Sequence, residues 1–507
     1  QIARQLVLRD NTVSPERKLT EIVIAAEIGK QYDKNFILQL YLNEIYFGNQ
    51  SYGVEAASEF YFGHPAADLN LPEAALLAGI IQSPATYDPV PTSSQDNRQV
   101  AFDRMKYVIQ RMVQVGCIPG SQENLGIELC VDSNTINAQG NLTGITAIQA
   151  SEVQTREYTP RQYRVRYPHF IQYIQARLEA TYGSDIFRRG FVVRTTLNPA
   201  IQDAAQQALE QQIAAMQNTG INTGSVMVTD PRTGAILAMV GSPDFNNADI
   251  DGQVNGALTW QQPGSSIKPV VYTGTFEGVD RNGDGRLDPS EYLTPASILW
   301  DVPYAYDNGT PISNYDGQYR GPMAVRFALQ QSINIPAVQA YKFIGNDRFV
   351  DTATRMGLTF LDGAQFSPAT GIGATEVRLY DMMEAYGTLA NNGVHTDLYA
   401  IESVTDAAGN PVPGPERTQA TQAVQPQIVY LINNILTDDA ARQPIFAPGT
   451  LTLPGFEGLI AAKTGTSNES RDLWTMGYTT NAVVGVWIGN VNNNPTFGTS
   501  GTAAAPI

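Results

Sequence analysis

The stretch Gln262-Pro-Gly-Ser-Ser-Ile-Lys-Pro269 marks the start of a helix and contains the most informative pair in the chain, Ser265 and Lys268. The two residues are one helical turn apart, which places both side chains on one face with their Cβ atoms about 5–6 Å from each other. Pro269 cannot donate a helical hydrogen bond and belongs in a first turn, so we expect the helix to begin near Ser265.

A serine at a helix start lies beside free backbone N–H groups and the positive end of the helix dipole, which favour a developing oxyanion. A serine hydroxyl is a weak nucleophile and needs a base. Lys268 can act as that base if burial or a nearby positive charge lowers its pKa. The pair therefore predicts a serine nucleophile with a lysine base.

Two further short motifs follow, Ser332-Ile-Asn334 and Lys463-Thr-Gly-Thr466. In an extended or loop geometry, Ser332 and Asn334 face the same side. The hydroxyl can then relay a proton to a leaving amine, and the amide can bind a substrate peptide group.

The third motif follows the apolar run 459–462, which predicts a strand. Gly465 has no side chain to block a substrate strand that pairs with the backbone. Lys463 and the hydroxyls of Thr464 and Thr466 suit a terminal carboxylate, and the charge of this second lysine can help to lower the pKa of the first.

Each motif alone is common by chance, as a surface triplet or a turn. Their order and spacing, which leave room for a helical lobe between them, predict one serine acyl-transfer site. The chain has three histidines, His64, His169 and His395, and none lies in the GxSxG setting of a Ser-His-Asp enzyme.

Composition limits the class of protein. A chain of 507 residues with 43% hydrophobic and 16% charged residues predicts two or three folded domains. Its net charge of −17 argues against nucleic acid and against broad adhesion to anionic lipid. The sequence contains no apolar run of about 18 residues that could span a membrane.

The pattern along the chain predicts a multidomain α+β protein with a helical region at 1–115, a linker or accessory region at 116–190 and a domain of strands and helices at 191–507. In the last region we expect strands at 191–197, 224–230, 235–240, 461–466 and 482–488, helices at 199–216, 266–277, 324–342 and 376–391, and a loop at 405–427. Cys117 and Cys130 are close enough in sequence to form a disulfide in an oxidising compartment, or they are two buried thiols.

A calcium-binding loop is predicted at 280–291, where the sequence fits D-x-[DN]-x-[DN]-G-x₅-E at every fixed position. Gly285 provides the sharp turn, and Ca²⁺ in a structural role suits an all-oxygen ligand set better than Mg²⁺. The alternative is a solvated turn. The ligands would be the side chains of Asp280, Asn282, Asp284, Asp288 (through water) and Glu291, and the carbonyl of Arg286.

The chain resembles the class A, bifunctional penicillin-binding proteins over nearly its whole length. The resemblance lies in the three motifs with their flanking residues, and in 473–478 and 486–489. It implies a transpeptidase domain with an antiparallel sheet flanked by helices, which uses no cofactor. Ser265 would be the nucleophile acylated by β-lactam antibiotics and Lys268 its base. Ser332 and Asn334 would assist proton transfer and substrate binding, residues 463–466 would bind the stem peptide, and the N–H groups of Ser265 and Thr466 would form the oxyanion hole.

The first region resembles the lysozyme-like peptidoglycan glycosyltransferase domain, which uses lipid II. Arg17-Lys-Leu-Thr-Glu21 matches its RKxxE motif, and residues 34–48, 52–57 and 72–79 match others. The resemblance makes Glu21 a functional glutamate and Arg17 and Lys18 substrate-binding residues, whereas the ordinary interpretation of Glu21 is a surface carboxylate on a helix.

The family's main catalytic glutamate would precede Gln1, and its STxTQQ motif survives only as Gln1-Ile-Ala-Arg-Gln5. We therefore expect these residues alone to lack glycosyltransferase activity. The resemblance also implies an upstream membrane anchor and an extracytoplasmic location. Two alternatives remain, a β-lactamase-like hydrolase and a non-enzymatic β-lactam sensor.

Overall fold

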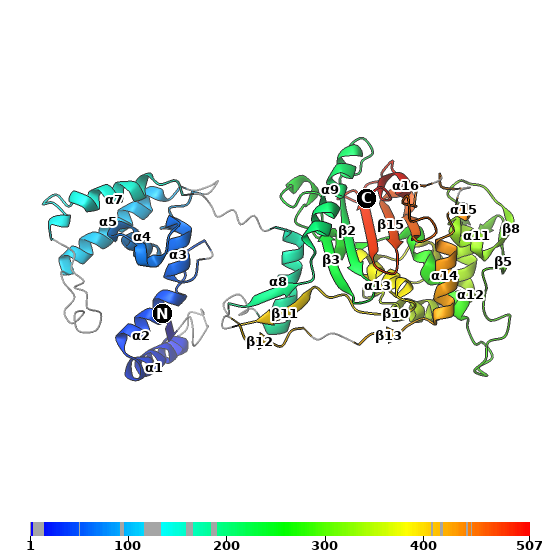
Figure 1. Cartoon of the computed structure of the whole chain (residues 1–507), viewed down its shortest axis with the longest axis horizontal. Helices are drawn as coiled ribbons and strands as arrows, with labels where there is room; N and C mark the ends of the chain where they lie inside the picture. The colour runs from blue at the N-terminus through cyan, green and yellow to red at the C-terminus, as the bar shows by residue number, and fades with distance from the viewer. Residues whose placement is uncertain are drawn as a thin grey trace. The chain divides into compact units, whose positions relative to one another are not determined.

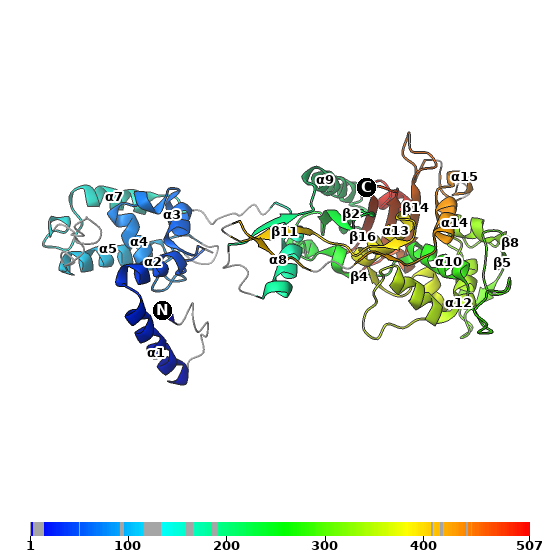
Figure 2. The same cartoon turned by 60° about the horizontal axis from the view of Figure 1, so that its bottom comes forward.

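The computed structural model describes residues 2–3, 15–49, 51–91, 96–115, 133–158, 166–183, 190–406, 409–415, 419–442, 445–447 and 449–507. The chain divides into two compact units, Gln1–Arg164 and Val165–Ile507. Figures 1 and 2 show the elements of each unit in two views. Among the described helices, none combines the length and the apolar character needed to cross a bilayer.

The first unit is helical, which confirms the prediction for this region. Helix α4 begins with a capping box in which Asn70 and Glu73 satisfy each other's backbone N–H groups, and it packs against α5 and α7 around Leu76, Ile80 and Met105. The helices are α1 (Pro15–Gln31), α2 (Lys34–Glu44), α3 (Val54–Phe62), α4 (Leu71–Ile80), α5 (Arg98–Val115) and α7 (Gly144–Thr155), with short 3₁₀ turns at Ala66–Asp68 and Ser133–Thr135.

The second unit is built on a five-stranded antiparallel sheet with the order β14-β15-β16-β2-β3, as predicted in type. Strands from the start and the end of the unit meet at its centre, where Val226 pairs with Val486. The strands are β2 (Thr223–Asp230), β3 (Ala235–Val240), β14 (Ala461–Thr466), β15 (Asp472–Tyr478) and β16 (Val483–Gly489).

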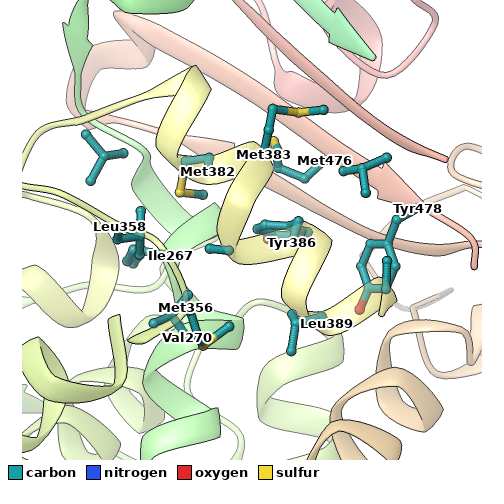
Figure 3. Packing of buried hydrophobic residues seen from close by; sticks show 14 of the residues in the cluster. Ile267, Val270, Met356, Leu358, Met382, Met383, Tyr386, Leu389, Met476 and Tyr478 are labelled. Carbon is teal, nitrogen blue, oxygen red and sulfur yellow. The ribbon is translucent and has the colours of Figure 1, made fainter. Parts of the chain in front are cut away.

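Both faces of this sheet are covered. Because side chains alternate along a strand, Val226 and Val228 pack with α9 (Pro199–Ala215) and α16 (Ser500–Ala503), whereas Met227 belongs to the larger core beneath α13 (Leu379–Ala390). In Figure 3, Met383 and Tyr386 of α13 lie beside Met476 and Tyr478 of β15. This packing fixes α13 between the sheet and the helical lobe.

The helical lobe lies in sequence between β3 and β14. Its helices are α10 (Lys268–Glu277), α11 (Val325–Gln330), α12 (Asn334–Arg355), α14 (Pro426–Leu436) and α15 (Asp439–Arg442). Helix α8 (Pro168–Tyr182) contacts β3 outside this lobe. The minor strands are β1 (Val192–Thr195), β4 (Trp260–Gln261), β5 (Ile298–Asp301), β6 (Tyr304–Ala305), β7 (Pro311–Ile312), β8 (Gly321–Ala324), β9 (Val377–Arg378), β10 (Val394–His395), β11 (Ile401–Thr405), β12 (Pro411–Val412) and β13 (Thr421–Gln422).

Two sequence predictions for this unit were wrong in detail. The single helix expected at 324–342 is two helices, because Ser332 adopts φ +61° between α11 and α12 and breaks the helical path. The loop expected at 405–427 contains the short strands β12, which pairs with the preceding strand β11, and β13, which pairs with β10.

The region 116–190 was predicted to be a linker or accessory region. Its described helices pack with the flanking units, α7 against α4 and α8 against β3. The boundaries of a separate linker stay a prediction. Cys117 and Cys130 lie outside the described residues, so their disulfide also stays a prediction.

Candidate active site

Ser265 lies in a 3₁₀ turn, Gly264–Ile267, that leads directly into α10. The α-helix itself begins at Lys268, one turn later than the sequence predicts, because Gly264 enters with φ +52° and tightens the first turn. Ser265 is partly exposed, and its hydroxyl makes no hydrogen bond to any described residue. The nucleophile is therefore accessible from the surface.

Lys268 is fully buried beneath this turn. Its Nζ donates to the Ser332 carbonyl at 2.7 Å, to Asn334 Oδ1 at 2.8 Å and to the Ile333 carbonyl at 3.3 Å. Burial lowers the pKa of Lys268 well below its usual value, and the nearby charge of Lys463 lowers it further. A neutral amine has two N–H groups, which can donate to the two closest of these oxygens. Its lone pair then stays available to accept a proton, as a general base requires.

The described residues show no hydrogen bond between Lys268 Nζ and Ser265 Oγ. Catalytic hydrogen bonds are often long or poorly aligned before substrate binds, so this spacing does not remove Lys268 as the base.

Ser332 lies between the two lysines. Its hydroxyl accepts from Lys463 Nζ at 2.7 Å and is 3.5 Å from Lys268 Nζ. The positive φ of this residue costs on the order of 1–3 kcal/mol in a non-glycine residue, and such strain is concentrated at functional sites. The backbone turn thus aims one hydroxyl at both amines.

Asn334 is the first residue of α12, and its amide is held at both ends. Its Oδ1 accepts from Lys268, and its Nδ2 donates to the Ser313 carbonyl at 2.9 Å. Its backbone N–H donates to Asn314 Oδ1 at 3.0 Å, and Asn314 in turn donates to the buried carboxylate of Asp301 at 2.7 Å. These two supporting residues were not predicted, because neither lies in a recognisable motif.

Lys463 enters from β14, an edge strand of the sheet, and is only 3% exposed. Burial lowers its pKa to about 7, and the positive charge of Arg442 contributes. Arg442 lies at the end of α15, is 2% exposed and donates to the carbonyl of Leu436. Arg442 was not predicted, since a lone arginine in a polar stretch gives no signal.

Two glycines allow the strand and the nucleophile turn to touch. A Cβ on Gly465 would lie 2.1 Å from the Pro263 carbonyl oxygen, and one on Gly264 would lie 2.4 Å from the Thr466 carbonyl oxygen. Any side chain at either position would push the turn away from β14. The close contact thus brings the backbone of Thr466 beside the turn that carries Ser265, where two N–H groups can face one oxyanion.

The remaining predicted residues of this motif lie on the same strand. Thr464 is buried, whereas Thr466 is exposed and its Oγ1 is 3.0 Å from Ser500 Oγ. The structure therefore gathers Ser265, Lys268, Ser332, Asn334 and residues 463–466 from three distant segments, as the three motifs predict.

The three residues predicted in the first unit also lie together, on α1. Arg17 and Lys18 each contact the Glu21 carboxylate at 2.8 Å. The hydrogen bonds from Lys18 and Arg17 lower the pKa of Glu21 to about 2. A carboxylate with so low a pKa stays ionised and can accept or stabilise positive charge, but it is a poor proton donor at neutral pH.

Comparison with known proteins identifies the class to which this fold and site belong. The family described as penicillin binding protein transpeptidase domain matches residues 224–507, and the family described as transglycosylase matches residues 1–113. The chain belongs to the penicillin-binding proteins, and the order of its two domains is that of the bifunctional class A members.

Two curated relatives illustrate the extent of the match. The chain is 27% identical to penicillin-binding protein 1A/1B of Bacillus subtilis over 96% of this chain and 51% of the relative. It is 28% identical to penicillin-binding protein 1B of Haemophilus influenzae over 100% of this chain and 60% of the relative. The chain thus spans between half and three fifths of the length of these relatives.

Solved structures support the fold. Penicillin-binding protein 1A of Haemophilus influenzae superposes with a TM-score of 0.69 at 20% identity, over 94% of this chain and 85% of that one. The PonA1 protein of Mycobacterium tuberculosis, solved in complex with penicillin V, superposes with a TM-score of 0.55 at 22% identity, over 67% of this chain and 90% of that one.

Proposed function

We propose that the second unit is a serine DD-transpeptidase that cross-links peptidoglycan stem peptides. The observation that carries this proposal is the convergence on Lys268 Nζ, which is fully buried and contacts Ser332 and Asn334 beside a second buried lysine. This arrangement gives a serine a neutral amine as its base without any histidine.

The reaction proceeds by acyl transfer. Ser265 Oγ attacks the carbonyl between the last two residues of the donor peptide while Lys268 takes the hydroxyl proton, and the N–H groups of Ser265 and Thr466 stabilise the oxyanion. Ser332 relays a proton to the departing D-alanine as the C–N bond breaks. An amine of a second stem peptide then attacks the acyl-enzyme carbonyl and gives a proton to Lys268, and that proton passes to Ser265 Oγ as the ester C–O bond breaks. No cofactor takes part.

β-Lactam antibiotics carry a strained amide that the same serine opens, so they test the assignment directly. We expect mass spectrometry after exposure to a fluorescent penicillin to show one adduct, on Ser265. Ser265→Ala should lose the adduct, while the matched variant Ser403→Ala, an exposed serine on β11, should keep it. Labelling that persists in Ser265→Ala would refute the proposal.

The lifetime of the adduct separates the alternatives. A transpeptidase holds the penicilloyl group for a long time, whereas a β-lactamase-like hydrolase releases it rapidly. A sensor would be acylated but would not exchange D-alanine from a stem-peptide substrate. The family membership and the edge strand β14, which offers an unpaired side to an extended peptide, favour the transpeptidase.

The first unit acts in the same pathway. It is a glycosyltransferase unit for lipid II in which Arg17 and Lys18 bind the anionic substrate beside Glu21. Both substrates belong to the outer side of the cell membrane, so the protein works there, anchored by a segment upstream of the residues in hand. The membrane anchor and this location rest on the family resemblance.

The loop at 280–291 binds calcium in a structural role. The donor set fits: its groups are carboxylates, an amide and a carbonyl, and Gly285 at φ +79° makes the turn that position 6 requires. Asp280 already accepts from the N–H groups of Gly283 and Gly285, which folds the loop around its first ligand. The incoming helix is α10, whereas the chain after Glu291 continues without a helix into β5.

Among the described residues, the group whose ligand atoms come within 4.8 Å of one another lies elsewhere. Glu291 is 5% exposed, and its carboxylate accepts from the N–H groups of Arg281 and Asp288, which holds it against the loop.

Calorimetry tests the calcium loop. Calcium should raise the melting temperature, and the pair Asp280→Ala with Glu291→Ala should remove that rise. Asp362→Ala, on an exposed turn outside the loop, is the matched control. Absence of binding at millimolar calcium would leave the loop as a turn only.

A further inference from the structure

A cluster of three metal-ligating side chains lies outside the acyl-transfer site. Glu384 comes from α13, His395 from β10, and Asp397 follows two residues later. One ligand atom from each lies within 4.8 Å of the other two. None of these residues belongs to the three catalytic motifs or to the calcium loop.

The distances suit a small divalent ion. His395 Nε2 is 3.4 Å from Glu384 Oε2, and His395 Nδ1 is 3.7 Å from Asp397 Oδ1. A tetrahedral ion with bonds of about 2.0–2.2 Å holds its ligand atoms roughly 3.3–3.6 Å apart. Because only one ring nitrogen can bind a given ion, Asp397 must turn toward Nε2, and its side chain is 49% exposed and free to rotate.

The other two ligands are held in place. Glu384 Oε1 accepts from the Leu398 N–H at 3.1 Å, which leaves Oε2 directed to the imidazole. A Cβ on Gly357 would lie 2.5 Å from His395 Nε2 and 2.6 Å from Glu384 Oε2, so the chain keeps a glycine where a side chain would separate the pair. Such outer contacts orient metal ligands in known sites.

The two carboxylates of the cluster, Glu384 and Asp397, line a partly polar cavity of about 330 Å³. Thr396, Tyr173 and Tyr380 also line it, as do the cationic residues Arg177 and Arg378. The cavity has room for the waters that complete the coordination of an ion with three protein ligands.

We propose that Glu384, His395 and Asp397 bind a divalent transition metal ion, with Zn²⁺ as the best fit. An imidazole nitrogen with two carboxylates favours Zn²⁺ over Ca²⁺ or Mg²⁺, which prefer oxygen ligands alone. The ion joins α13 to the segment 394–397. The same helix contacts the nucleophile turn, where the Tyr386 hydroxyl donates to the Ser266 carbonyl at 2.7 Å, so the ion stiffens a helix that supports the active site.

Titration calorimetry with ZnCl₂ on the whole protein tests the site. The protein is first stripped with a chelator, its thiols are alkylated because Cys117 and Cys130 could also bind zinc, and 1 mM Ca²⁺ is present throughout to occupy oxygen-only sites. We expect one equivalent of zinc to bind, with a rise in melting temperature.

Three variants decide the outcome. His395→Ala and the conservative change Asp397→Asn should each weaken zinc binding at least tenfold, while His64→Asn, at a partly exposed histidine in the first unit, should leave it unchanged. Circular dichroism confirms that each variant is folded. If the folded wild-type protein takes up no zinc, or if zinc binds equally well to both cluster variants, the three residues form only an ion-pair cluster and the proposal fails.

Discussion

The two charged sites of this chain are built in opposite ways. On α1, Glu21 meets Arg17 and Lys18, which are three and four residues away on the same helix. In the second unit, Lys268 meets groups that are 64 to 66 residues away, and Lys463 meets a serine that is 131 residues away. The first cluster is a local product of helical spacing, and the second exists only when the domain is folded.

The difference in burial gives the two sites different chemistry. The partners of Glu21 are its own helical neighbours, and they keep it ionised. The lysines of the second unit are buried. Burial lowers their pKa values, which favours the neutral form of each amine. A buried residue whose charged form is destabilised becomes reactive as its neutral form. A residue whose charge is stabilised by an ion pair stays ionised.

Replacement of the buried base should have the largest effect. Lys268→Met keeps the length of the side chain but removes its amine, so acylation by penicillin should slow by roughly 10²–10⁴-fold. Stopped-flow measurement of acylation with a fluorescent penicillin gives the rate. Lys342→Met, at a lysine on α12 that pairs with Asp307, is the control and should acylate at the wild-type rate. If Lys268→Met is acylated at the wild-type rate, the buried lysine is not the base, and the contrast between a reactive buried site and an ionised surface site fails.

The supporting network around Asn334 should matter next. Asn314→Ala removes the acceptor of the Asn334 N–H and the donor to Asp301 Oδ1, so that oxygen is left unsatisfied although the Arg320 N–H still donates to Oδ2. An unsatisfied buried polar group costs about 1–3 kcal/mol, so urea denaturation should show a loss of that size. Acylation should slow, though less than in Lys268→Met. The nearby exposed variant Asn308→Ala should change neither quantity, and equal losses in both variants would contradict the network.

Arg442 should tune the second lysine. The pKa of Lys463 is lowered to about 7 by burial and then by Arg442. Loss of that positive charge in Arg442→Gln should raise the pKa of Lys463. Lys463 should then stay protonated, and bind the substrate carboxylate, up to a higher pH. The limb of the acylation–pH profile that lies near pH 7 should therefore shift to higher pH.

The charge-matched control for this shift is Arg194→Gln. Arg194 is an exposed arginine on β1, so its loss changes the net charge equally without touching the site. If both variants shift the profile by the same amount, the effect comes from net charge, and Arg442 has no specific part in it.

Features set by residues a few positions apart could be predicted from the sequence. Features that depend on contacts between distant segments could not. The spacing of Ser265 and Lys268, and the strand that carries Lys463, could be predicted because each is set within a few residues. The left-handed turn at Ser332 could not, since a serine gains that conformation only where its surroundings hold it. Asn314 and Arg442 act through contacts with distant segments, and no local pattern records such contacts.

The smallest effect should follow from Glu21→Gln on α1. Ion pairs between helical neighbours at the surface contribute little to stability, because water and salt screen them, and Lys18 is 59% exposed. We therefore expect the melting temperature of Glu21→Gln at pH 7 to fall only slightly below that of the wild type.

The pH dependence of this local pair can be given a sign. The pKa of Glu21 is lowered to about 2 in the folded chain, so the pair stabilises the helix above the ordinary glutamate pKa of about 4.5, and that contribution is lost as pH falls toward 2. Nuclear magnetic resonance titration of the Glu21 carboxyl should give a low midpoint that rises in high salt, because salt screens an exposed pair. A midpoint unmoved by salt would show that Glu21 is shielded from solvent like the lysines of the second unit, and the contrast between the two sites would no longer hold.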